Sequence, residues 1–311
     1  MPTILTLTMN PSIDVSAAVE RVVPEDKLRC QDACFEAGGG GINVSRVIRR
    51  LGDTSRAFYT SGGATGRMLQ RMLDEEELDH HPIQIAERTR QNFTALDETA
   101  NQEFRFVLPG PTLSEEEWRR CLDALFTVEP RPRYIVASGS MPPGVPDGFY
   151  AQVARRGKEE GVRVIVDASD EALRAAMGEG VYLIKPNVQE LSELAGRELE
   201  TQSEQEATAL EIVERGQSEV VVVSFGGEGA LVASQEGCEW FYPPDIEAQS
   251  AVGAGDSMVA LIVLSLANGL SLHEAVRNGI AAGAAAAMTP GTELCHPEDV
   301  EQLVEQVIEE P

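Results

Sequence analysis

The chain has 311 residues, 42% of them hydrophobic, so it can build a sizeable core in one large α/β domain or two smaller ones. Its formal net charge of −26 argues against nucleic acids and anionic membranes as partners. No apolar run reaches the roughly 18 residues of a membrane span, and the N-terminus lacks the basic and apolar regions of a signal peptide, so we expect a cytoplasmic protein.

The first third of the chain mixes helices, strands and hairpins. β-forming residues predict strands at 2–8 and 55–60, and the turn after the first strand leaves Asp14 just past its end. Glycine-rich turns open helical patterns at 38–51 and 62–77. Short alternating patterns predict hairpins at about 16–37 and 92–107, the second across a turn-rich stretch.

After Pro109 strands and helices alternate regularly. We expect strands at 134–138, 163–167, 181–185 and 220–224, then paired strands at 230–233 and 239–242. We expect helices at 114–126, 147–161, 171–177, 188–195 and 203–215. The last two helices of the chain are expected at 255–268 and 271–288. Strands separated by helices predict a doubly wound parallel sheet, into which the two hairpins insert as a small β lid covering about 16–37 and 88–108.

The stretch Ala251–Ser257 precedes the most apolar helical pattern of the chain. Gly253, Ala254 and Gly255 let the backbone approach a ligand, and the free N–H groups of the first helical turn would point at it. We expect Asp256 to be ionised there, because N–H donors and the helix dipole favour its charged form. This arrangement would be an anion hole for a phosphoryl group beside an acceptor for an alcohol proton. The alternative is an N-cap aspartate after a flexible turn.

The four glycines Gly38–Gly41, followed by Asn43, suit close backbone approach to a polyhydroxylated ligand, and the alternative is a loose turn before a helix. Two common phosphate-binding motifs are excluded. A P-loop needs Gly-Lys-Ser/Thr, but Gly157-Lys158 is followed by Glu159. A dinucleotide fingerprint needs a third glycine where Asn43 stands.

Two further turns follow predicted strands. In Lys185–Glu190, Asn187 and Glu190 share one face and could hold a hydrated Mg²⁺, or they could form only a capping box. Ser224–Gly229 could pass under a nucleotide, or it could be a tight hairpin turn. Of five cysteines only Cys30 and Cys34 are close, and no zinc site is complete, which favours reduced thiols.

Along essentially its full length the chain resembles the ribokinase-like (PfkB) sugar kinases. Two signatures carry the resemblance, Gly-Gly-Gly-Gly-Ile-Asn at 38–43 and Val-Gly-Ala-Gly-Asp at 252–256. Within the family it is most similar to the minor ATP-dependent 6-phosphofructokinase branch, on the stretches 5–14, 25–30, 89–92 and 138–144. The resemblance implies one kinase domain over 1–311, with a three-layer αβα core, a mostly parallel sheet, a β lid and a homodimer formed through the lid.

The resemblance also implies a role for each matching position. Asp256 would be the catalytic base, in an anion hole made by Gly253, Ala254 and Gly255. The sugar would be bound by Asp14, Gly39, Asn43 and Ser138, and its phosphate by Lys27 and Arg90, with Arg29 reaching the site of the partner subunit. The ATP site would be lined by Lys185, Asn187, Ser224, Gly226 and Gly229, with Mg²⁺ organised through water by Asn187 and Glu190. A monovalent cation such as K⁺ would bind at Ser250, Val252, Ala286 and Gly291, although Thr289 and Glu293 replace the family's asparagine and arginine.

The leading interpretation is ATP-dependent phosphorylation of fructose 6-phosphate at its 1-hydroxyl. Tagatose-6-phosphate kinase and 1-phosphofructokinase share both signatures and remain alternatives. A sugar-phosphate sensor without catalytic activity is a third hypothesis, against which the intact Asp256 and anion hole argue.

Only three lysines occur, at 27, 158 and 185, and two of them fall at expected phosphate positions. A strongly acidic, lysine-poor chain also fits a salt-adapted host.

Overall fold

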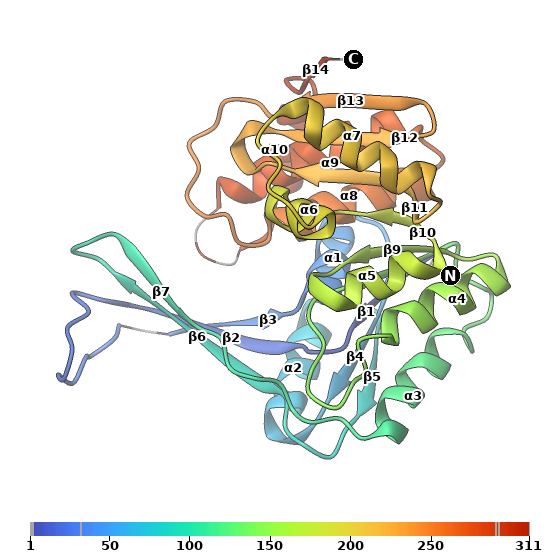
Figure 1. The fold of residues 1–311 in the computed structure, drawn as a ribbon. Helices are drawn as coiled ribbons and strands as arrows, with labels where there is room; N and C mark the ends of the chain where they lie inside the picture. The colour runs from blue at the N-terminus through green and yellow to red at the C-terminus, as the bar shows by residue number, and fades with distance from the viewer. Residues whose placement is uncertain (1–2, 32, 290, 292, 311) are drawn as a thin grey trace.

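The computed structural model describes residues 3–31, 33–289, 291 and 293–310, so the predicted strand start at Pro2 lies outside them. In this part of the chain the main sheet has ten strands, of which β12, β13 and β14 are antiparallel to their neighbours and the rest are parallel (Figure 1). In sheet order they are β14 (Ile308–Glu310), β13 (Gly237–Tyr242), β12 (Ala230–Ser234), β11 (Ser218–Ser224), β10 (Val181–Ile184), β9 (Arg163–Asp167), β8 (Tyr134–Ser138), β1 (Ile4–Thr8), β4 (Arg56–Ser61) and β5 (His80–Gln84).

Helices cover both faces of this sheet, which confirms the αβα core. Successive residues of a strand point to opposite faces, so Val164 and Val166 pack with one helical layer and Ile165 with the other. The first layer contains α3 (Glu115–Leu125), α4 (Phe149–Glu160), α5 (Asp170–Glu179), α6 (Val188–Ala195) and α7 (Gln202–Glu214). The second contains α1 (Gly40–Arg50), α2 (Gly63–Glu75), α8 (Ala254–Ala267), α9 (Leu272–Ala287) and α10 (Pro297–Val304).

Helix α8 is buried along most of its length, from Ser257 to Leu266. It packs closely on α9 because Gly279 has no side chain: a Cβ atom there would lie 2.6 Å from Cγ1 of Ile262. Because its sequence is apolar on every side, α8 can be surrounded by other buried side chains from Ser257 onward. Among the described residues no helix has both the length and the apolar character needed to cross a membrane.

The predicted lid is a separate four-stranded sheet that projects from the core (Figure 1). Its strands, in sheet order, are β3 (Cys34–Gly38), β2 (Ser12–Val19), β6 (Arg90–Asp97) and β7 (Gln102–Phe106). Both predicted hairpins form, and parallel pairing of β2 with β6 joins them into one sheet. The lid strands begin at Ser12, earlier than predicted, so Asp14 lies within β2 and not after a strand end.

Three elements were not predicted from the sequence. Strand β5 contains His80, His81 and Pro82 and pairs only with β4, because a proline is tolerated at a sheet edge. The predicted helix over 271–288 is not the last one, since α10 follows it, with Pro297 at the first helical position. Strand β14 is only three residues long and pairs with β13, so its local sequence carries little signal.

Candidate active site

The candidate site lies where parallel strands β1, β8, β9, β10 and β11 end. The carboxyl ends of parallel strands share one edge of a sheet, the usual place for ligands in α/β folds. Ser138, Asp167 and Ser224 are the last residues of β8, β9 and β11, and Lys185 follows β10 directly. Helix α8 begins beside them, since a Cβ atom at Gly255 would lie 3.3 Å from Nζ of Lys185.

Asp256 is the third residue of α8, and Gly253 is the N-cap, with a left-handed φ of 78°. The prediction that Asp256 could be the N-cap is therefore wrong. The Oδ2 atom of Asp256 accepts a hydrogen bond of 2.8 Å from Nδ2 of Asn43 on α1. The N–H groups of Ala254 and Gly255 precede the first intrahelical bond, which Ser257 donates to Gly253, so they are oriented toward whatever occupies the helix mouth.

The charge state of Asp256 differs from the sequence-based expectation of an ionised group. Burial and the nearby charge of Asp167 raise the pKa of Asp256 to about 7, against the opposing effects of Asn43 and Lys185. Loss of water around the carboxylate outweighs the favourable donors, because burial penalises a charge strongly. At neutral pH the protonated and ionised forms therefore coexist, which suits a general base.

Lys185 is a buried basic residue at this edge of the sheet. It is only 8% exposed, and its Nζ lies 3.2 Å from Oδ1 of Asp167. Burial opposes its charge, but the carboxylates of Asp167, Glu190 and Asp256 raise the pKa of Lys185 above its ordinary value. Asp167 was not predicted as a site residue, although an acidic residue ending a buried strand at this edge was a usable signal.

The glycine run lets the backbone pass close to polar side chains. A Cβ atom at Gly38 would lie 2.2 Å from Oδ2 of Asp14, and one at Gly40 would lie 2.1 Å from Oγ of Ser138. Gly39 is the N-cap of α1 and has a φ of 124°, which favours glycine. The run is therefore required by its surroundings and is not a loose turn.

Asp14 is held on the lid by two donors that the sequence did not reveal. Its Oδ1 atom accepts from Oγ of Ser12 at 2.7 Å and from Nδ2 of Asn92 at 2.8 Å. Asn92 lies opposite Asp14 in the β2–β6 register. This parallel pairing joins segments 78 residues apart, so local sequence patterns could not predict the contact.

The resemblance assigns Lys27 and Arg90 to the sugar phosphate and Arg29 to the site of the partner subunit, and these side chains have two different environments. Arg90 donates to the backbone oxygens of Asn10 and Leu108, at 3.0 and 3.1 Å. Burial lowers the pKa of Arg90, while Asp14 opposes this effect. Lys27 and Arg29 lie on the exposed connection between β2 and β3, and within the described residues their side chains make no hydrogen bond or ion pair.

The predicted nucleotide turns have defined structures. Asn187 and Glu190 form a reciprocal capping box at the start of α6, and burial followed by the charge of Asp167 raises the pKa of Glu190. Gly226 belongs to a short 3-10 turn between antiparallel β11 and β12, so the predicted hairpin turn is present. Gly229 has a structural requirement of its own, because a Cβ atom there would lie 2.2 Å from the oxygen of Phe241.

The expected monovalent-cation loop is held by hydroxyl groups. Oγ of Ser250 donates to the oxygen of Gly291 at 2.7 Å and accepts from the N–H of Val252 at 3.2 Å. The Thr289 hydroxyl lies within hydrogen-bond distance of the oxygens of Ala286 and Glu293, at 2.8 and 2.6 Å. The loop thus carries several carbonyl and hydroxyl oxygens, the ligand type that suits a K⁺ ion.

A cavity of about 510 Å³ separates the lid from the core. One wall is the polar face of the lid sheet, with Ser16, Glu36 and Arg105, and the other includes Val252 and Glu293. Among the described residues, five buried side-chain atoms have no hydrogen-bond partner: Oδ1 of Asn10, Oδ1 of Asn43, Nε of Arg90, Oγ of Ser257 and Oε1 of Glu309. Two of these atoms, Oδ1 of Asn43 and Nε of Arg90, belong to residues of the candidate site, where a ligand could satisfy them.

Comparisons with known proteins agree with this architecture. The family model described as pfkB family carbohydrate kinase matches residues 6–299. The chain is 43% identical to an ATP-dependent 6-phosphofructokinase isozyme 2 of Mycobacterium tuberculosis, over 99% of this chain and 91% of the relative. It is 42% identical to the isozyme 2 of Escherichia coli, over 97% and 98% of the two chains. A 1-phosphofructokinase of Bacillus subtilis is 33% identical over 98% of each chain.

Solved structures of phosphofructokinase-2 from Escherichia coli are similar in fold. The complex with potassium has a TM-score of 0.94 at 42% identity, and the complex with fructose-6-phosphate has 0.93 at 41%. Both comparisons cover 98% of this chain and 99% of the other. A structure of the tetrameric inhibited form of the same enzyme also has a TM-score of 0.93, with the same coverage.

Proposed function

The chain belongs to the pfkB family of carbohydrate kinases, and we propose on this basis that it transfers the γ-phosphoryl group of ATP to the 1-hydroxyl of fructose 6-phosphate. The observation that carries the proposal is the position of Asp256 in the first turn of α8. This turn combines a proton acceptor, the carboxylate of Asp256, with N–H donors for phosphoryl oxygens. The identity of 42–43% to two 6-phosphofructokinases, against 33% to a 1-phosphofructokinase, supports this substrate.

In the proposed reaction Asp256 accepts the proton of the attacking hydroxyl. The N–H groups of Gly253, Ala254 and Gly255 stabilise the negative charge on the transferred phosphoryl oxygens. Asn43 orients the carboxylate of Asp256 through its Nδ2, and its unpartnered Oδ1 remains to accept from a sugar hydroxyl. Phosphoryl transfer depends mainly on positioning and charge neutralisation, and these groups supply both.

The remaining roles follow the strand edge and the lid. Asp14, Gly39 and Ser138 bind sugar hydroxyls, and Lys27 and Arg90 bind the 6-phosphate, with Arg29 of one subunit reaching the site of the other. ATP lies along Lys185, Asn187, Ser224, Gly226 and Gly229. The carboxylate of Glu190, with Asn187, suits a hydrated Mg²⁺, which would neutralise phosphate charge when bound. The oxygen set at Ser250, Val252, Ala286 and Gly291 would hold K⁺.

We further propose that two copies associate through the lid. The lid face opposite Asp14 is apolar: Val15 pairs with Phe35 and Phe93, and Phe93 stacks on Phe106 with 6.2 Å between ring centroids. Phe35 and Phe106 are 46% and 54% exposed, a large apolar surface for a monomer. A second copy would cover this apolar surface.

The five free cysteines fit the reducing cytoplasm.

A coupled kinase assay over a panel of sugar phosphates tests the substrate. We expect kcat/KM for fructose 6-phosphate to exceed the values for tagatose 6-phosphate and fructose 1-phosphate. A higher value for either alternative would reassign the substrate but keep the kinase. No turnover of any sugar phosphate, with ligand binding retained, would favour the sensor hypothesis instead.

A further inference from the structure

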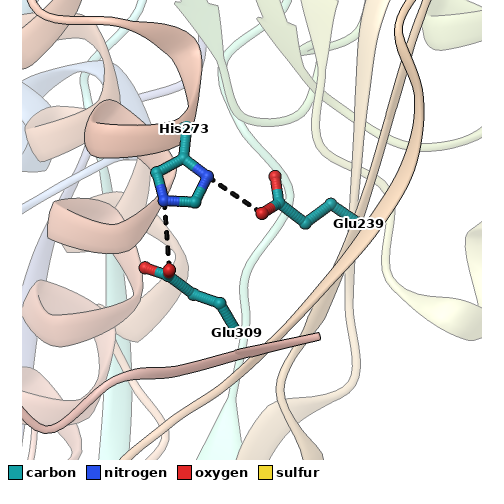
Figure 2. Close-up of side chains that lie close together, drawn as sticks. All are labelled: Glu239, His273 and Glu309. Atoms are coloured by element: carbon teal, nitrogen blue, oxygen red, sulfur yellow. Dashed lines mark ion pairs between the residues drawn. The ribbon is translucent and has the colours of Figure 1, made fainter. Parts of the chain in front are cut away.

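Figure 2 shows a cluster of two carboxylates and one imidazole, which lies on elements that the candidate active site does not use. Glu239 is on β13, His273 is in the first turn of α9, and Glu309 is on the C-terminal strand β14. Nδ1 of His273 lies 2.9 Å from Oε1 of Glu239, and Nε2 lies 3.1 Å from Oε2 of Glu309. One ligand atom from each of the three residues lies within 4.8 Å of the other two.

The donor set is typical of a divalent transition-metal ion. Zinc is bound by imidazole nitrogen and carboxylate oxygen at 2.0–2.2 Å, so bound ligand atoms lie roughly 3–4 Å apart. The two carboxylates now contact different ring nitrogens of His273, so one of them would have to move to the other nitrogen's side to share an ion. His273 is 43% exposed, so an ion and its remaining water ligands can reach the cluster. The net charge of −26 also attracts cations to this surface.

The buried Oε1 atom of Glu309 is a second, independent indication of a ligand. It has no hydrogen-bond partner within the described chain. Nε of Arg277 lies 3.5 Å away but donates to the oxygen of Val304 at 3.0 Å. Glu274, the next acidic residue on α9, is occupied in the capping box with Ser271. The second oxygen of Glu309 therefore forms an ion pair with Arg277 but accepts no hydrogen bond within the described residues, and a divalent ion would compete with that guanidinium for it.

We propose that Glu239, His273 and Glu309 bind a divalent transition-metal ion of the zinc class. The ion would crosslink the start of α9 to β13 and to β14, the last strand of the sheet. Strand β14 is short and, among the described strands, pairs with β13 alone, so this crosslink would stabilise its attachment. The site is separate from the proposed Mg²⁺ position at Asn187 and Glu190, and the proposal does not depend on the kinase reaction.

The test is calorimetric titration of the EDTA-treated, nucleotide-free protein with Zn²⁺, with excess Mg²⁺ present throughout to occupy sites that prefer hard cations. We expect one zinc ion per chain and a higher melting temperature. His273→Gln and Glu309→Gln should each weaken binding about tenfold or more. Two control variants should bind as the wild type does: His296→Gln, whose imidazole faces the single carboxylate of Glu293, and Cys30→Ser/Cys34→Ser, which removes the exposed thiols. Unchanged binding by His273→Gln, or its loss in either control, would overturn the proposal.

A second measurement leaves the three proposed ligands unsubstituted. The chain has only four histidines, so their ring proton signals can be followed by NMR while Cu²⁺ is added at substoichiometric amounts. We expect one histidine signal to broaden before the rest, and the His296→Gln control should retain it. Simultaneous broadening of all four signals, or selective broadening of the signal that His296→Gln removes, would overturn the site.

Discussion

Asn43 and Asp256 are 213 residues apart in sequence and are joined by a hydrogen bond of 2.8 Å. The bond connects the first turn of α1 to the first turn of α8, so the two family signatures form one structural unit. Because the amide donates to Oδ2, it fixes the direction of the carboxylate while leaving the other oxygen of Asp256 for a substrate proton. The pair thus links the sugar-binding segment to the proposed base.

Replacing Asp256 with Asn should abolish most of the activity without disturbing the fold. The amide has the same size and can still accept from Asn43, but it cannot take a proton. We expect kcat to fall by at least about 10²-fold, the lower end of general-base effects, with ATP affinity retained in equilibrium binding. A loss smaller than about tenfold would show that Asp256 is not the base.

The activity should depend on pH in the way that an acceptor with a pKa of about 7 requires. Because burial raises the pKa of Asp256 to about 7, kcat/KM should increase with pH through that value as the carboxylate ionises. The stability effect has the opposite direction: a raised folded-state pKa stabilises the fold at low pH, and this contribution is lost as pH rises through 7.

The Asp256→Asn variant is the control for this effect, because its side chain does not titrate. Between pH 5 and 8 the wild type should lose stability relative to the variant in denaturant titrations. A difference that stays constant over this range would contradict the raised pKa.

Lys27→Ala should raise KM for the sugar phosphate by about tenfold or more while leaving KM for ATP nearly unchanged, because a charge-assisted phosphate contact is lost. Lys27 is exposed and its side chain makes no hydrogen bond or ion pair within the described residues, so the substitution should not affect stability. Arg90→Ala should raise the same KM but also lower the melting temperature, since Arg90 holds two backbone oxygens. Equal increases in both KM values for Lys27→Ala would refute its assignment to the phosphate.

Phe106→Glu should weaken association of the two copies by about tenfold or more, because a charge would enter the apolar lid face. Sedimentation velocity at several protein concentrations measures the effect. Leu270→Glu is a matched control, since Leu270 is an exposed apolar residue, 41% accessible, between α8 and α9. Equal dissociation constants for the two variants would place the interface elsewhere.

Added KCl should raise the melting temperature of this chain and also raise KM for the sugar phosphate. At a net charge of −26 the compact state repels itself. The Debye length falls from about 10 Å at 0.1 M to about 3 Å at 1 M, which weakens both this repulsion and the attraction of phosphates to basic groups.

Tetramethylammonium chloride at equal ionic strength separates general screening from specific K⁺ binding near Ser250. A larger stabilisation by KCl would support the cation site. Melting temperatures that are flat or falling with salt would reject the salt-adapted interpretation.

The sequence by itself determined the alternation of strands and helices and both glycine-rich signatures. These features are local: a capping box at Ser114 or Asn187 and an apolar run such as 220–224 can each be recognised from a few consecutive residues. It missed β5, α10 and β14, which are short or polar and owe their form to the neighbouring elements. Strand pairing is a non-local event, so their own residues carry little of the information.

Only the tertiary structure decided which polar groups meet and what their environment does to them. The pairs Asp14–Asn92 and Lys185–Asp167 depend on strand register and sheet order. The pKa of Asp256 depends on the burial and charges around it, so the ionised state predicted from the helix start alone becomes a mixture of protonated and ionised forms near neutral pH. The cluster at Glu239, His273 and Glu309 joins three elements that no local pattern connects. The pKa values and contacts of these residues depend on the folded chain, because desolvation and charge act through space and not along the sequence.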